Sequence, residues 1–597
     1  MTELRVENLT VSFGAGSGVS TVVDDVNLAV GTGETVAIVG ESGSGKSVTA
    51  LSIMRLLPKR TAHVSGRVLL DDTDLLALPE RAMQDVRGSE IAMIFQEPMT
   101  SLNPVLTVGH QLIEVIRRHQ RISKAAAKTE AIALLDRVKI AAPERRVDDY
   151  PHEMSGGMLQ RAMIAMALAG NPRILLADEP TTALDVTVQA QILDLLRELQ
   201  AETDMGLLLI THDMGVVAEA ADRTVVMFRS RELESGTTAQ IFAEPAHAYT
   251  RALLSAVPRL GSMAGSAIPA TFPLTDVDSG IVTPARTITT DPGGTVLDVR
   301  NLTTRFDIRS GPLRRVTARV HAVEDVSVSI DAHQTLSLVG ESGSGKSTLG
   351  RSILRLVEPS AGSILLNGED VRAMGPRRLQ RERARMQMIF QDPFSSLNPR
   401  MTVGQAIAEP MLVHGIARRD DVADKVAELL RRVSLSPDVA TCYPHEFSGG
   451  QRQRVSIARA LSLNPDLIVA DEAVSALDVT VKAQVVNLLL ELQEQFGIAF
   501  LFISHDMSVV ERLSHRVAVM YLGEIVEIGS RAQIFENPQH PYTRRLLDSV
   551  PVADPAIRRQ RITREGFEPG SAVRPADYVH TPARYREHAP GHLVKES

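Results

Sequence analysis

The sequence predicts an α/β protein built from two similar domains in tandem, each with a mostly parallel sheet at its core. Two observations carry this prediction: motifs of one half recur in the same order in the other, and short apolar runs alternate with longer amphipathic stretches. Composition agrees, because aromatic residues make up only 4% of 597 residues and Trp is absent. The core must therefore be aliphatic, which suits buried parallel strands covered by helices.

The repeat is visible as four strings that occur twice. They are Gly-Glu-Ser-Gly-Ser-Gly-Lys-Ser at Gly40 and Gly340, Phe-Gln-(Glu/Asp)-Pro at Phe95 and Phe390, Tyr-Pro-His-Glu at Tyr150 and Tyr443, and Ala-Asp-Glu at Ala177 and Ala470. Their spacing differs only early in each copy. The chain is therefore a duplication with a few residues gained or lost in loops.

The segments outside the repeats differ in composition. Residues 261–294 are rich in Gly, Pro, Ser and Thr, with few charges and no helical period, which is typical of a linker. Residues 553–597 carry scattered Arg, Pro and His, and we expect a loosely packed C-terminal tail to which composition assigns no role. The predicted domains are therefore 1–260 and 295–552.

Within each copy, short apolar runs bounded by helical patterns predict buried parallel strands with crossover helices. These runs are Thr35–Val39, Arg173–Ala177 and Gly206–Ile210 in the first copy, and Thr335–Val339, Leu467–Ala470 and Ile498–Ile503 in the second. Ligands bind such sheets at the carboxyl ends of the strands. The chemical motifs lie at those ends.

Bulk properties restrict the class of protein without naming a partner. A net charge of -8 argues against a surface built to neutralise nucleic acid. The single cysteine, Cys442, excludes an internal disulfide and any cysteine-based metal cluster, and it fits a reducing compartment. No leader-like start and no uncharged apolar run of about 18 to 20 residues is found, so we expect any membrane connection to come through a partner.

Each glycine-rich string matches the G-x-x-x-x-G-K-[ST] phosphate loop, and each follows an apolar strand and precedes a helical pattern. The glycines let backbone N–H groups converge on a phosphate, the lysine reaches the β- and γ-phosphates of ATP, and the last serine ligates Mg²⁺. An incidental glycine-rich turn would not recur in the same place in both copies. The expected ligands are Gly40, Ser42, Gly43, Gly45, Lys46 and Ser47, and Gly340, Ser342, Gly343, Gly345, Lys346 and Ser347.

Two adjacent acids follow a buried strand in each copy: Asp178 and Glu179, and Asp471 and Glu472. A helix N-cap would explain only one acid per copy, and two acids in a desolvated place indicate a cation. We expect the aspartate to hold Mg²⁺ and the glutamate to polarise the attacking water.

The remaining repeated motifs separate the classes of phosphate-loop enzyme. Four motifs of each copy resemble those of ATP-binding cassette (ABC) ATPases. The signature is resembled by His-Glu-Met-Ser-Gly-Gly-Met (152–158) and His-Glu-Phe-Ser-Gly-Gly-Gln (445–451), and the Q-loop by Gln96 and Gln391. The D-loop is resembled by the Ala-Leu-Asp turns ending at Asp185 and Asp478, and the H-loop by His212 and His505. The resemblance covers both halves. It implies two P-loop nucleotide-binding domains of the ABC type in tandem, each a core lobe plus a helical subdomain.

The resemblance also implies how the sites work. Two cassettes close head to tail around two ATP molecules, so the first site would add Ser448, Gly449, Gly450 and Gln451, and the second would add Ser155, Gly156 and Gly157. Gln96 and Gln391 would bind nucleotide and Mg²⁺, and His212 and His505 would be catalytic with Glu179 and Glu472. Phe13 and Phe306 could stack on adenine, as an aromatic residue does in the family, or could be core residues.

Two departures from the family pattern are visible. Met158 stands where the signature usually ends in Gln, and Ala473 replaces the Pro found at Pro180 in the first copy. Neither removes a phosphate ligand. We therefore expect both sites to be competent, with unequal rates allowed.

Longer strings resemble the bacterial dipeptide/oligopeptide/nickel importer subfamily: residues 96–104 and 391–399, and the closing His-Ala-Tyr-Thr-Arg-Ala-Leu-Leu (247–254) and His-Pro-Tyr-Thr-Arg-Arg-Leu-Leu (540–547). The chain looks like both ATPase subunits fused, as in glutathione-type importers. This implies two membrane permease subunits that contact about 97–150 and 392–442, an extracytoplasmic solute-binding protein, no nucleic acid, and a peripheral place on the cytoplasmic face of the bacterial inner membrane. Peptide is the favoured solute, and glutathione, nickel, opines and sugars stay open.

The main alternative is a soluble tandem-cassette ATPase that remodels ribosomes or DNA. Such proteins tend to have a long charged helical linker or inserted zinc modules. Residues 261–294 are short, nonhelical and poor in charge, and zinc-type cysteines are absent. The sequence therefore favours a transporter subunit.

Overall fold

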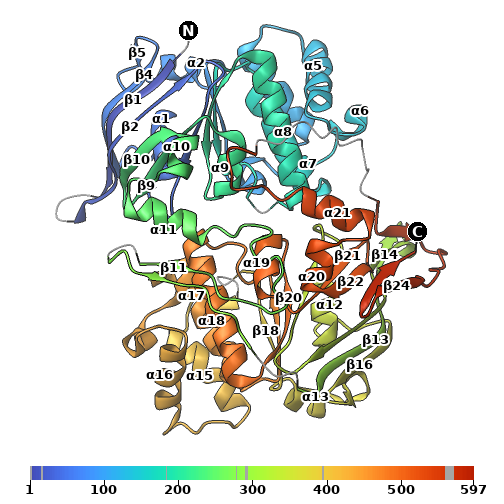
Figure 1. Ribbon diagram of the computed structural model, residues 1–597. Helices are drawn as coiled ribbons and strands as arrows, with labels where there is room; N and C mark the ends of the chain where they lie inside the picture. Colours follow the sequence, from blue (N-terminus) through green and yellow to red (C-terminus); the bar gives the residue numbers. More distant parts are fainter. Residues whose placement is uncertain are drawn as a thin grey trace. The chain divides into compact units, whose positions relative to one another are not determined.

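The computed structural model describes residues 3–14, 18–182, 184–276, 279–289, 293–312, 314–392, 396–557 and 570–596. The chain forms two compact units (Figure 1). Unit 1 comprises Met1–Val257, Thr275–Ile281 and Pro551–Arg561, and unit 2 comprises Pro258–Leu274, Val282–Val550 and Ile562–Ser597. The segment expected to be a linker is thus divided between the units. Ala183 of the first Ala-Leu-Asp turn, residues 393–395 of the second long string and 558–569 of the expected tail lie outside the described residues.

Unit 1 is organised around a 10-stranded sheet with the order β5-β4-β1-β2-β10-β9-β3-β8-β7-β6. Its strands are β1 (Glu3–Phe13), β2 (Ser20–Gly31), β3 (Thr35–Val39), β4 (Ala62–Leu70), β5 (Thr73–Asp74), β6 (Ile91–Ile94), β7 (Ile174–Asp178), β8 (Gly206–Ile210), β9 (Arg223–Phe228) and β10 (Arg231–Thr237). Strands β6, β7, β8, β3 and β9 run parallel, and the apolar runs predict three of them, β3, β7 and β8. Strands β1, β2 and β4 form an antiparallel part.

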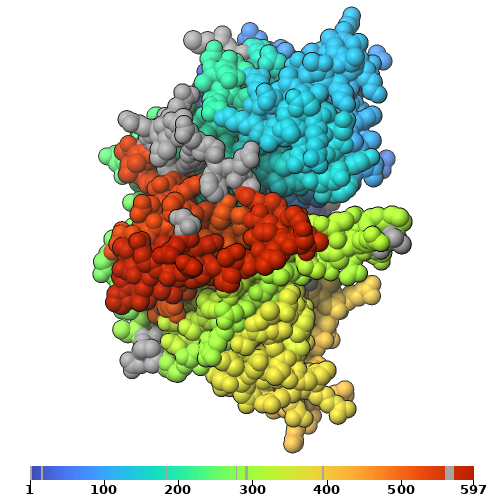
Figure 2. Space-filling view, turned by 90° about the vertical axis from the view of Figure 1, so that its right-hand side faces the viewer, coloured from blue at the N-terminus to red at the C-terminus, as the bar shows by residue number. Residues whose placement is uncertain are grey.

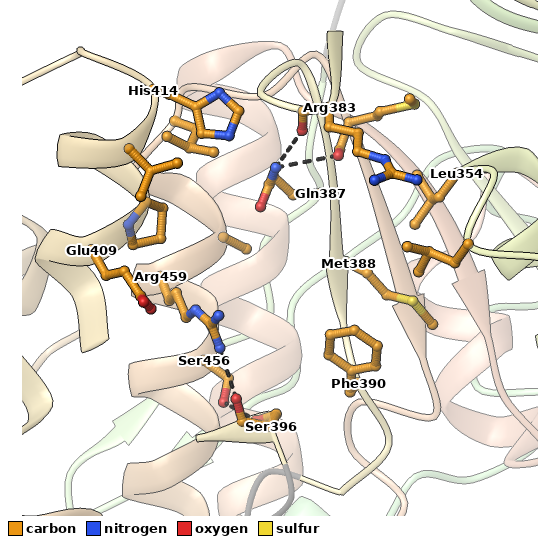
Figure 3. Close-up of a pocket in the computed structure, with 16 residues that line it drawn as sticks. Leu354, Arg383, Gln387, Met388, Phe390, Ser396, Glu409, His414, Ser456 and Arg459 are labelled. Atoms are coloured by element: carbon orange, nitrogen blue, oxygen red, sulfur yellow. Dashed lines mark hydrogen bonds between the residues drawn. The ribbon is translucent and has the colours of Figure 1, made fainter. Parts of the chain in front are cut away.

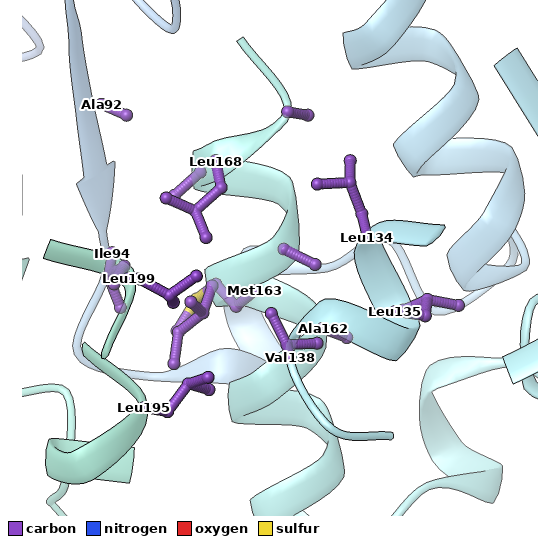
Figure 4. Close-up of a cluster of buried hydrophobic side chains, with 14 of the residues drawn as sticks. Ala92, Ile94, Leu134, Leu135, Val138, Ala162, Met163, Leu168, Leu195 and Leu199 are labelled. Atoms are coloured by element: carbon purple, nitrogen blue, oxygen red, sulfur yellow. The ribbon is translucent and has the colours of Figure 1, made fainter. Parts of the chain in front are cut away.

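Helices of unit 1 cover the sheet and build a separate helical part. They are α1 (Lys46–Ile53), α2 (Glu80–Val86), α3 (Pro98–Ser101), α4 (Val108–His119), α5 (Lys124–Arg137), α6 (Pro143–Arg146), α7 (Gly156–Leu168), α8 (Val186–Thr203), α9 (Met214–Ala220), α10 (Thr238–Ala243) and α11 (Ala248–Ala256). Side chains of α5, α7 and α8 meet those of β6 in one apolar cluster, with Met163 among them (Figure 4). This cluster joins the helical subdomain to the parallel strands.

Unit 2 repeats this plan in two sheets, with orders β17-β16-β13-β14-β23 and β18-β19-β20-β15-β21-β22-β25-β24. The strands that correspond to unit 1 are β13 (Thr295–Ser310), β14 (Arg315–Asp331), β15 (Thr335–Val339), β16 (Ala361–Leu366), β17 (Glu369–Asp370), β18 (Met386–Ile389), β19 (Leu467–Asp471), β20 (Ala499–Ile503), β21 (Arg516–Tyr521) and β22 (Glu524–Ser530). Strands β18, β19, β20, β15 and β21 are parallel.

The helices of unit 2 follow the same order as those of unit 1. They are α12 (Lys346–Ile353), α13 (Pro376–Glu382), α15 (Val403–Val413), α16 (Val422–Arg432), α17 (Gly449–Leu461), α18 (Val479–Phe496), α19 (Met507–Leu513), α20 (Arg531–Glu536) and α21 (Pro541–Asp548). The predicted fold class, two α/β domains with a mostly parallel core and a helical subdomain, is therefore confirmed. Among the described residues, no helix combines the length and apolarity needed to cross a membrane.

The segments expected to be a linker and a loose tail have structure of their own. Short strands β11 (Leu274–Thr275) and β12 (Val282–Thr283) lie in the first, and β23 (Val573–Pro575), β24 (Tyr585–Ala589) and β25 (His592–Lys595) lie in the second. In unit 2, Phe272 is buried, and its backbone exchanges hydrogen bonds with the Asn487 amide at 2.7 and 3.0 Å. Buried apolar side chains, among them Phe272, Ile288 and Val594, hold these segments together with such polar contacts.

Candidate functional site

The two phosphate-loop strings form the turns between β3 and α1 and between β15 and α12. Gly45 has φ +99°, and a Cβ there would lie 2.5 Å from the carbonyl oxygen of Val22. Gly345 has φ +105°, and a Cβ there would lie 1.9 Å from the oxygen of Ala322. Only glycine fits these positions, so each loop wraps tightly against the neighbouring antiparallel strand.

Each loop lysine lies under its own loop. Nζ of Lys46 donates to the carbonyl oxygens of Gly40 and Glu41, both at 2.8 Å, and Nζ of Lys346 donates to those of Gly340 and Glu341 at the same distance. Both lysines are buried. The ammonium groups are thus held at the centre of a curved backbone, where a phosphate would find them together with the first N–H groups of a helix.

The loop serines contact the first acid of each Asp-Glu pair. Ser47 Oγ donates to Asp178 Oδ1 at 2.9 Å, and Ser347 Oγ donates to Asp471 Oδ1 at 2.7 Å. Burial raises the pKa of Asp178 to about 6, and it also raises the pKa of Asp471. Asp471 Oδ2 is buried without a hydrogen-bond partner. A hydroxyl and a desolvated carboxylate in contact form a donor set that suits a hard cation.

The second acid of each pair belongs to a different network. Gln96 Nε2 donates to Glu179 Oε2 at 2.9 Å, and His212 Nδ1 lies 3.3 Å from Glu179 Oε1. Gln391 Nε2 donates to Glu472 Oε2 at 2.7 Å, and His505 Nδ1 lies 3.5 Å from the same carboxylate. Gln96 and Gln391 thus contact the glutamate in this structure, rather than the serine–aspartate pair.

The pKa values of the two glutamates move opposite to those of the aspartates. Burial opposes ionisation of Glu179, but the hydrogen bond and positive charge of His212 and the hydroxyl of Thr182 lower its pKa to about 2. The same balance, with His505 as the partner, lowers the pKa of Glu472. Glu179 and Glu472 also have positive φ, 47° and 48°. Non-glycine residues adopt this conformation at a cost, and it directs the carboxylates into the networks.

Strand order explains why these residues meet. In unit 1, β6, β7, β8 and β3 are neighbours, and Gln96, Asp178, Glu179 and His212 lie at or just beyond their carboxyl ends. In unit 2 the neighbouring strands are β18, β19, β20 and β15. Their carboxyl ends bring together Gln391, Asp471, Glu472 and His505.

The signature motifs begin helices α7 and α17. Ser155 and Ser448 are N-caps, and their Oγ atoms accept from the backbone N–H of Met158 (3.3 Å) and of Gln451 (3.4 Å). Gln451 Oε1 also accepts from Ser448 N–H at 3.0 Å, which closes a capping box that Met158 does not form. The next residues are Gly156 and Gly157 in unit 1 and Gly449 and Gly450 in unit 2. The second glycine of each pair packs close to a valine of the following helix, since a Cβ at Gly157 would lie 2.8 Å from Val188 and one at Gly450 would lie 2.3 Å from Val481.

The two candidate adenine-stacking residues have different surroundings. Phe13 is partly buried against the apolar cluster of β1, β2 and β3, whereas Phe306 is 43% exposed on β13. Phe306 is therefore accessible to a ligand, whereas Phe13 packs partly against the core.

The structure adds residues that the motifs alone did not single out. Tyr249 Oη accepts from Glu41 N–H at 3.1 Å and Tyr542 Oη accepts from Glu341 N–H at 2.9 Å, so a C-terminal helix of each unit supports its phosphate loop. Both tyrosines lie in the closing strings quoted above, which is the signal that could have found them. Thr182 donates to Glu179 Oε2 at 2.8 Å, and Arg351 lies 3.6 Å from Asp471 Oδ2.

Comparison with known proteins agrees with this geometry. The sequence profile described as ABC transporter matches residues 23–182 and 323–475. The chain belongs to the ABC transporter family. A second profile, described as Oligopeptide/dipeptide transporter, C-terminal region, matches residues 233–275 and 526–575, so both halves of this ABC protein carry it.

Curated ABC relatives extend the similarity to nearly the whole chain. The glutathione import ATP-binding protein GsiA of Escherichia coli (strain K12) is 56% identical over 568 residues, covering 94% of this chain and 91% of the relative. The protein of the same name from Pectobacterium atrosepticum is 56% identical over 575 residues with the same coverage. The chain is thus an ATP-binding, ATP-hydrolysing subunit of an ABC transport system of the peptide type. These matches give no support to the ribosome or DNA alternative.

Proposed function

We propose that this chain powers the import of a small peptide-like solute, with glutathione the first candidate, by ATP hydrolysis at two sites of the same chemistry. One observation carries the proposal: the serine–aspartate pair and the glutamine–glutamate–histidine network occur in both units with nearly equal distances. The names of relatives that match 94% of the chain supply the solute.

ATP binding requires the loop lysine to change partners. Lys46 and Lys346 now donate to loop carbonyl oxygens, and these bonds are replaced by bonds to the β- and γ-phosphates when nucleotide enters. Ser47 with Asp178, and Ser347 with Asp471, would hold Mg²⁺, which supplies charge neutralisation of the phosphates when bound. Asp471 Oδ2 accepts no hydrogen bond and the pKa of Asp178 is raised, and both features fit carboxylates suited to binding a cation.

Glu179 and Glu472 orient the attacking water. A carboxylate whose pKa is held at about 2 is ionised at neutral pH and is a weak proton acceptor, so Glu179 acts by accepting a hydrogen bond from the water. His212 and Gln96 fix the carboxylate in place. Gln96 and Gln391 would also sense the nucleotide, because each extends from the end of an adjacent strand to the glutamate.

In the ATP-bound state we expect each signature to complete the site of the other cassette. The N-termini of α7 and α17 present serine, glycine N–H groups and a helix dipole, which are suited to a γ-phosphate. Ser448, Gly449, Gly450 and Gln451 would serve the Lys46 site, and Ser155, Gly156 and Gly157 would serve the Lys346 site. Hydrolysis would then weaken the contact between the two cassettes, so that each cycle of ATP binding and hydrolysis would close and open them.

A cavity in unit 2 supports the assignment of a permease partner. It has a volume of about 330 Å³ and lies between β18, α15 and α17, with Met388 and Phe390 on one wall and Glu409 and His414 on the other (Figure 3). Part of its lining comes from the segment 392–442 that the resemblance assigns to permease contact. We propose that a permease loop enters here and that the chain is held on the cytoplasmic face of the inner membrane by two permeases, with an extracytoplasmic solute-binding protein delivering solute.

Co-expression with the two permeases tests this proposal. We expect a detergent-stable complex whose Mg²⁺-dependent ATPase activity rises several-fold when glutathione-loaded binding protein is added. The matched control is binding protein without solute. Cosedimentation of the chain with ribosomes or DNA, and no complex with permeases, would overturn the proposal.

A further inference from the structure

The C-terminal residues of unit 2 add strands to two sheet edges. Strand β23 pairs with β14, with Val573 opposite Val320 and Pro575 opposite Ala318. Strand β25 pairs with β22, with Val594 opposite Glu527. Figure 2 shows this segment, in red, on the surface of unit 2 beside the yellow-green residues of the N-terminal strands of that unit. Exposed sheet edges carry unpaired N–H and C=O groups, and these strands cover them.

The same two strands meet in both units, since Glu324 N–H donates to Gly523 O at 2.8 Å in unit 2 and Asp24 N–H donates to Ser230 O at 2.7 Å in unit 1, but no added strands cover them in the described part of unit 1. There, β2 and β10 correspond to β14 and β22, and they pair with each other at Asp24 and Arg231. The Arg231 guanidinium lies 2.7 Å from Asp24. A cavity of about 620 Å³ opens beside this pair, and its lining includes Phe228 and His247.

The ion pair of unit 1 is not repeated in unit 2. The counterparts of Asp24 and Arg231 are two acids, Glu324 and Glu524, so this ion pair has no equivalent in unit 2. The C-terminal segment supplies one cation, Lys595, and two histidines that contact acids of β22. Glu524 lies 2.6 Å from Lys595 and 3.6 Å from His580, and the buried Glu527 lies 2.7 Å from the buried His592.

Glu324 is satisfied within unit 2 by Arg305 at 2.6 Å and His321 at 2.6 Å. The C-terminal segment adds to this cluster as well. The ring of Tyr578 meets that of His321 edge-on at 5.2 Å between centroids, and His321 N–H donates to Ala572 O at 2.9 Å. The segment is therefore anchored by backbone, ring and charge contacts at several places.

Strand β14 connects this anchored segment to the nucleotide site. On its other side it pairs with β13, and the register places Phe306 opposite Val320, which is itself opposite Val573. Residues opposite one another on neighbouring strands have side chains on the same face, so Phe306, Val320 and Val573 form one row. Phe306 and Val573 are 43% and 44% exposed. The same strand supplies Ala322, whose carbonyl lies against Gly345 of the phosphate loop.

We propose that the C-terminal segment 570–596 is part of the second nucleotide site. Val573 extends the apolar surface that begins at Phe306 and receives the adenine ring, and β23 fixes β14 behind that surface and behind the phosphate loop. ATP affinity at the Lys346 site therefore depends on the segment, whereas affinity at the Lys46 site does not. The inference rests on the proposed function, because it assumes that the Lys346 site binds ATP.

The test uses the full chain in two backgrounds, Lys46→Ala and Lys346→Ala, each of which leaves one working site. Binding of methylanthraniloyl-ATP with Mg²⁺ is measured by fluorescence. A chain that ends at residue 569 should show a Kd raised about tenfold in the Lys46→Ala background and unchanged within about twofold in the Lys346→Ala background.

Point variants keep the test informative if truncation disturbs folding. Val573→Asn should raise the Kd about three- to fivefold in the Lys46→Ala background, and Val573→Ile should restore it. Val579→Asn is the matched control, because Val579 lies in the same segment, is 83% exposed and should change nothing. Equal changes in both backgrounds, or none with Val573→Asn, would overturn the inference. Absence of binding in Lys46→Ala with an intact segment would overturn the proposed function of that site, and the inference with it.

Discussion

The two units differ in packing where the helical subdomain meets the sheet. In unit 1, Met163 of α7 is buried in the apolar cluster and Met166 packs against it. The counterparts in unit 2 are Ser456 and Arg459 of α17, which line the cavity of about 330 Å³. A second difference lies nearby. In unit 1, the His119 ring packs against Gly88, and a Cβ on Gly88 would lie only 2.6 Å from His119 Nε2. In unit 2, Arg383 stands at the position of Gly88.

This contrast separates what the two units must share from what they are free to change. The serine–aspartate and glutamate–histidine contacts are repeated in both units, as the proposed hydrolysis of ATP at two sites of the same chemistry would require. At the surface proposed to meet a permease, methionine side chains fill the space in unit 1, whereas unit 2 has a cavity with Ser456 and Arg459 at the corresponding positions. Two different permease subunits would explain this difference, because each would need its own complementary surface.

Exchanging the residues at the equivalent positions Met163 of unit 1 and Ser456 of unit 2 should give the largest effect on the free energy of unfolding. Met163→Ser removes a buried side chain from the unit 1 cluster and should lower the free energy of unfolding of that unit by about 3 kcal/mol. The reverse change, Ser456→Met, places its side chain into an existing cavity and should cost less than about 1.5 kcal/mol. Urea unfolding of the full chain measures both. Equal costs would mean that the two regions are packed alike.

A smaller effect, dependent on pH, distinguishes the turns that begin β3 and β15. Thr35 N–H donates to Asp222 Oδ2 at 3.0 Å, whereas Thr335 N–H donates to His515 Nδ1 at 3.1 Å. Burial lowers the pKa of His515 to about 4. The unfolded chain therefore binds a proton more readily than the folded one, so this contribution is complete above about pH 6.5 and is lost as the pH falls toward 4.

At pH 5 the free energy of unfolding of unit 2 should therefore be lower than at pH 7 by an amount on the order of 2 kcal/mol. His515→Gln keeps an acceptor for Thr335 N–H and cannot titrate, so it should remove that part of the pH dependence. Denaturant unfolding at pH 5 and pH 7 provides the measurement. Identical pH dependence in the variant and the parent chain would show that His515 does not carry the effect.

The smallest predicted difference lies at the start of α9 and α19. Gln189 Nε2 donates to Asp213 Oδ2 at 3.3 Å in unit 1, and the equivalent contact in unit 2 is an ion pair of Lys482 Nζ with Asp506 Oδ2 at 2.8 Å. Lys482→Gln should cost less than about 1 kcal/mol in denaturant unfolding, because the carboxylate keeps a donor. A cost above about 3 kcal/mol would show that Asp506 depends on a charged partner. Gln189→Lys is the reverse control.

Much of the fold follows from local pattern. The runs Thr35–Val39 and Thr335–Val339 are strands with those bounds, because an apolar run of this length between turn residues suits a buried parallel strand. Strands β23 and β25 do not follow from pattern. Strand β23 pairs with β14, and β25 pairs with β22, near Glu524 and Glu527. The scattered Arg, Pro and His residues of this segment show no periodicity that could predict such distant partners.

The site shows the same division. Strand order brings Ser47 to Asp178 and His212 to Glu179, so motifs at strand ends predict these neighbours. Support from Tyr249 arises from tertiary packing, because Tyr249 is 208 residues from Glu41 in the sequence, whereas Thr182 contacts Glu179 locally, three residues away. Arg351 follows Ser347 by one helical turn, but only the packing of α12 against β19 brings it to Asp471.

The central claim, that both units carry a working hydrolytic site, is tested most directly by the paired variants Glu179→Gln and Glu472→Gln. Steady-state ATPase activity is measured in the complex with both permeases, and ATP binding is the control, because the amide keeps the shape of the side chain. We predict that each variant retains ATP binding and that each loses most of the turnover, at least tenfold. Unchanged turnover in Glu472→Gln, with turnover abolished in Glu179→Gln, would contradict the claim for unit 2.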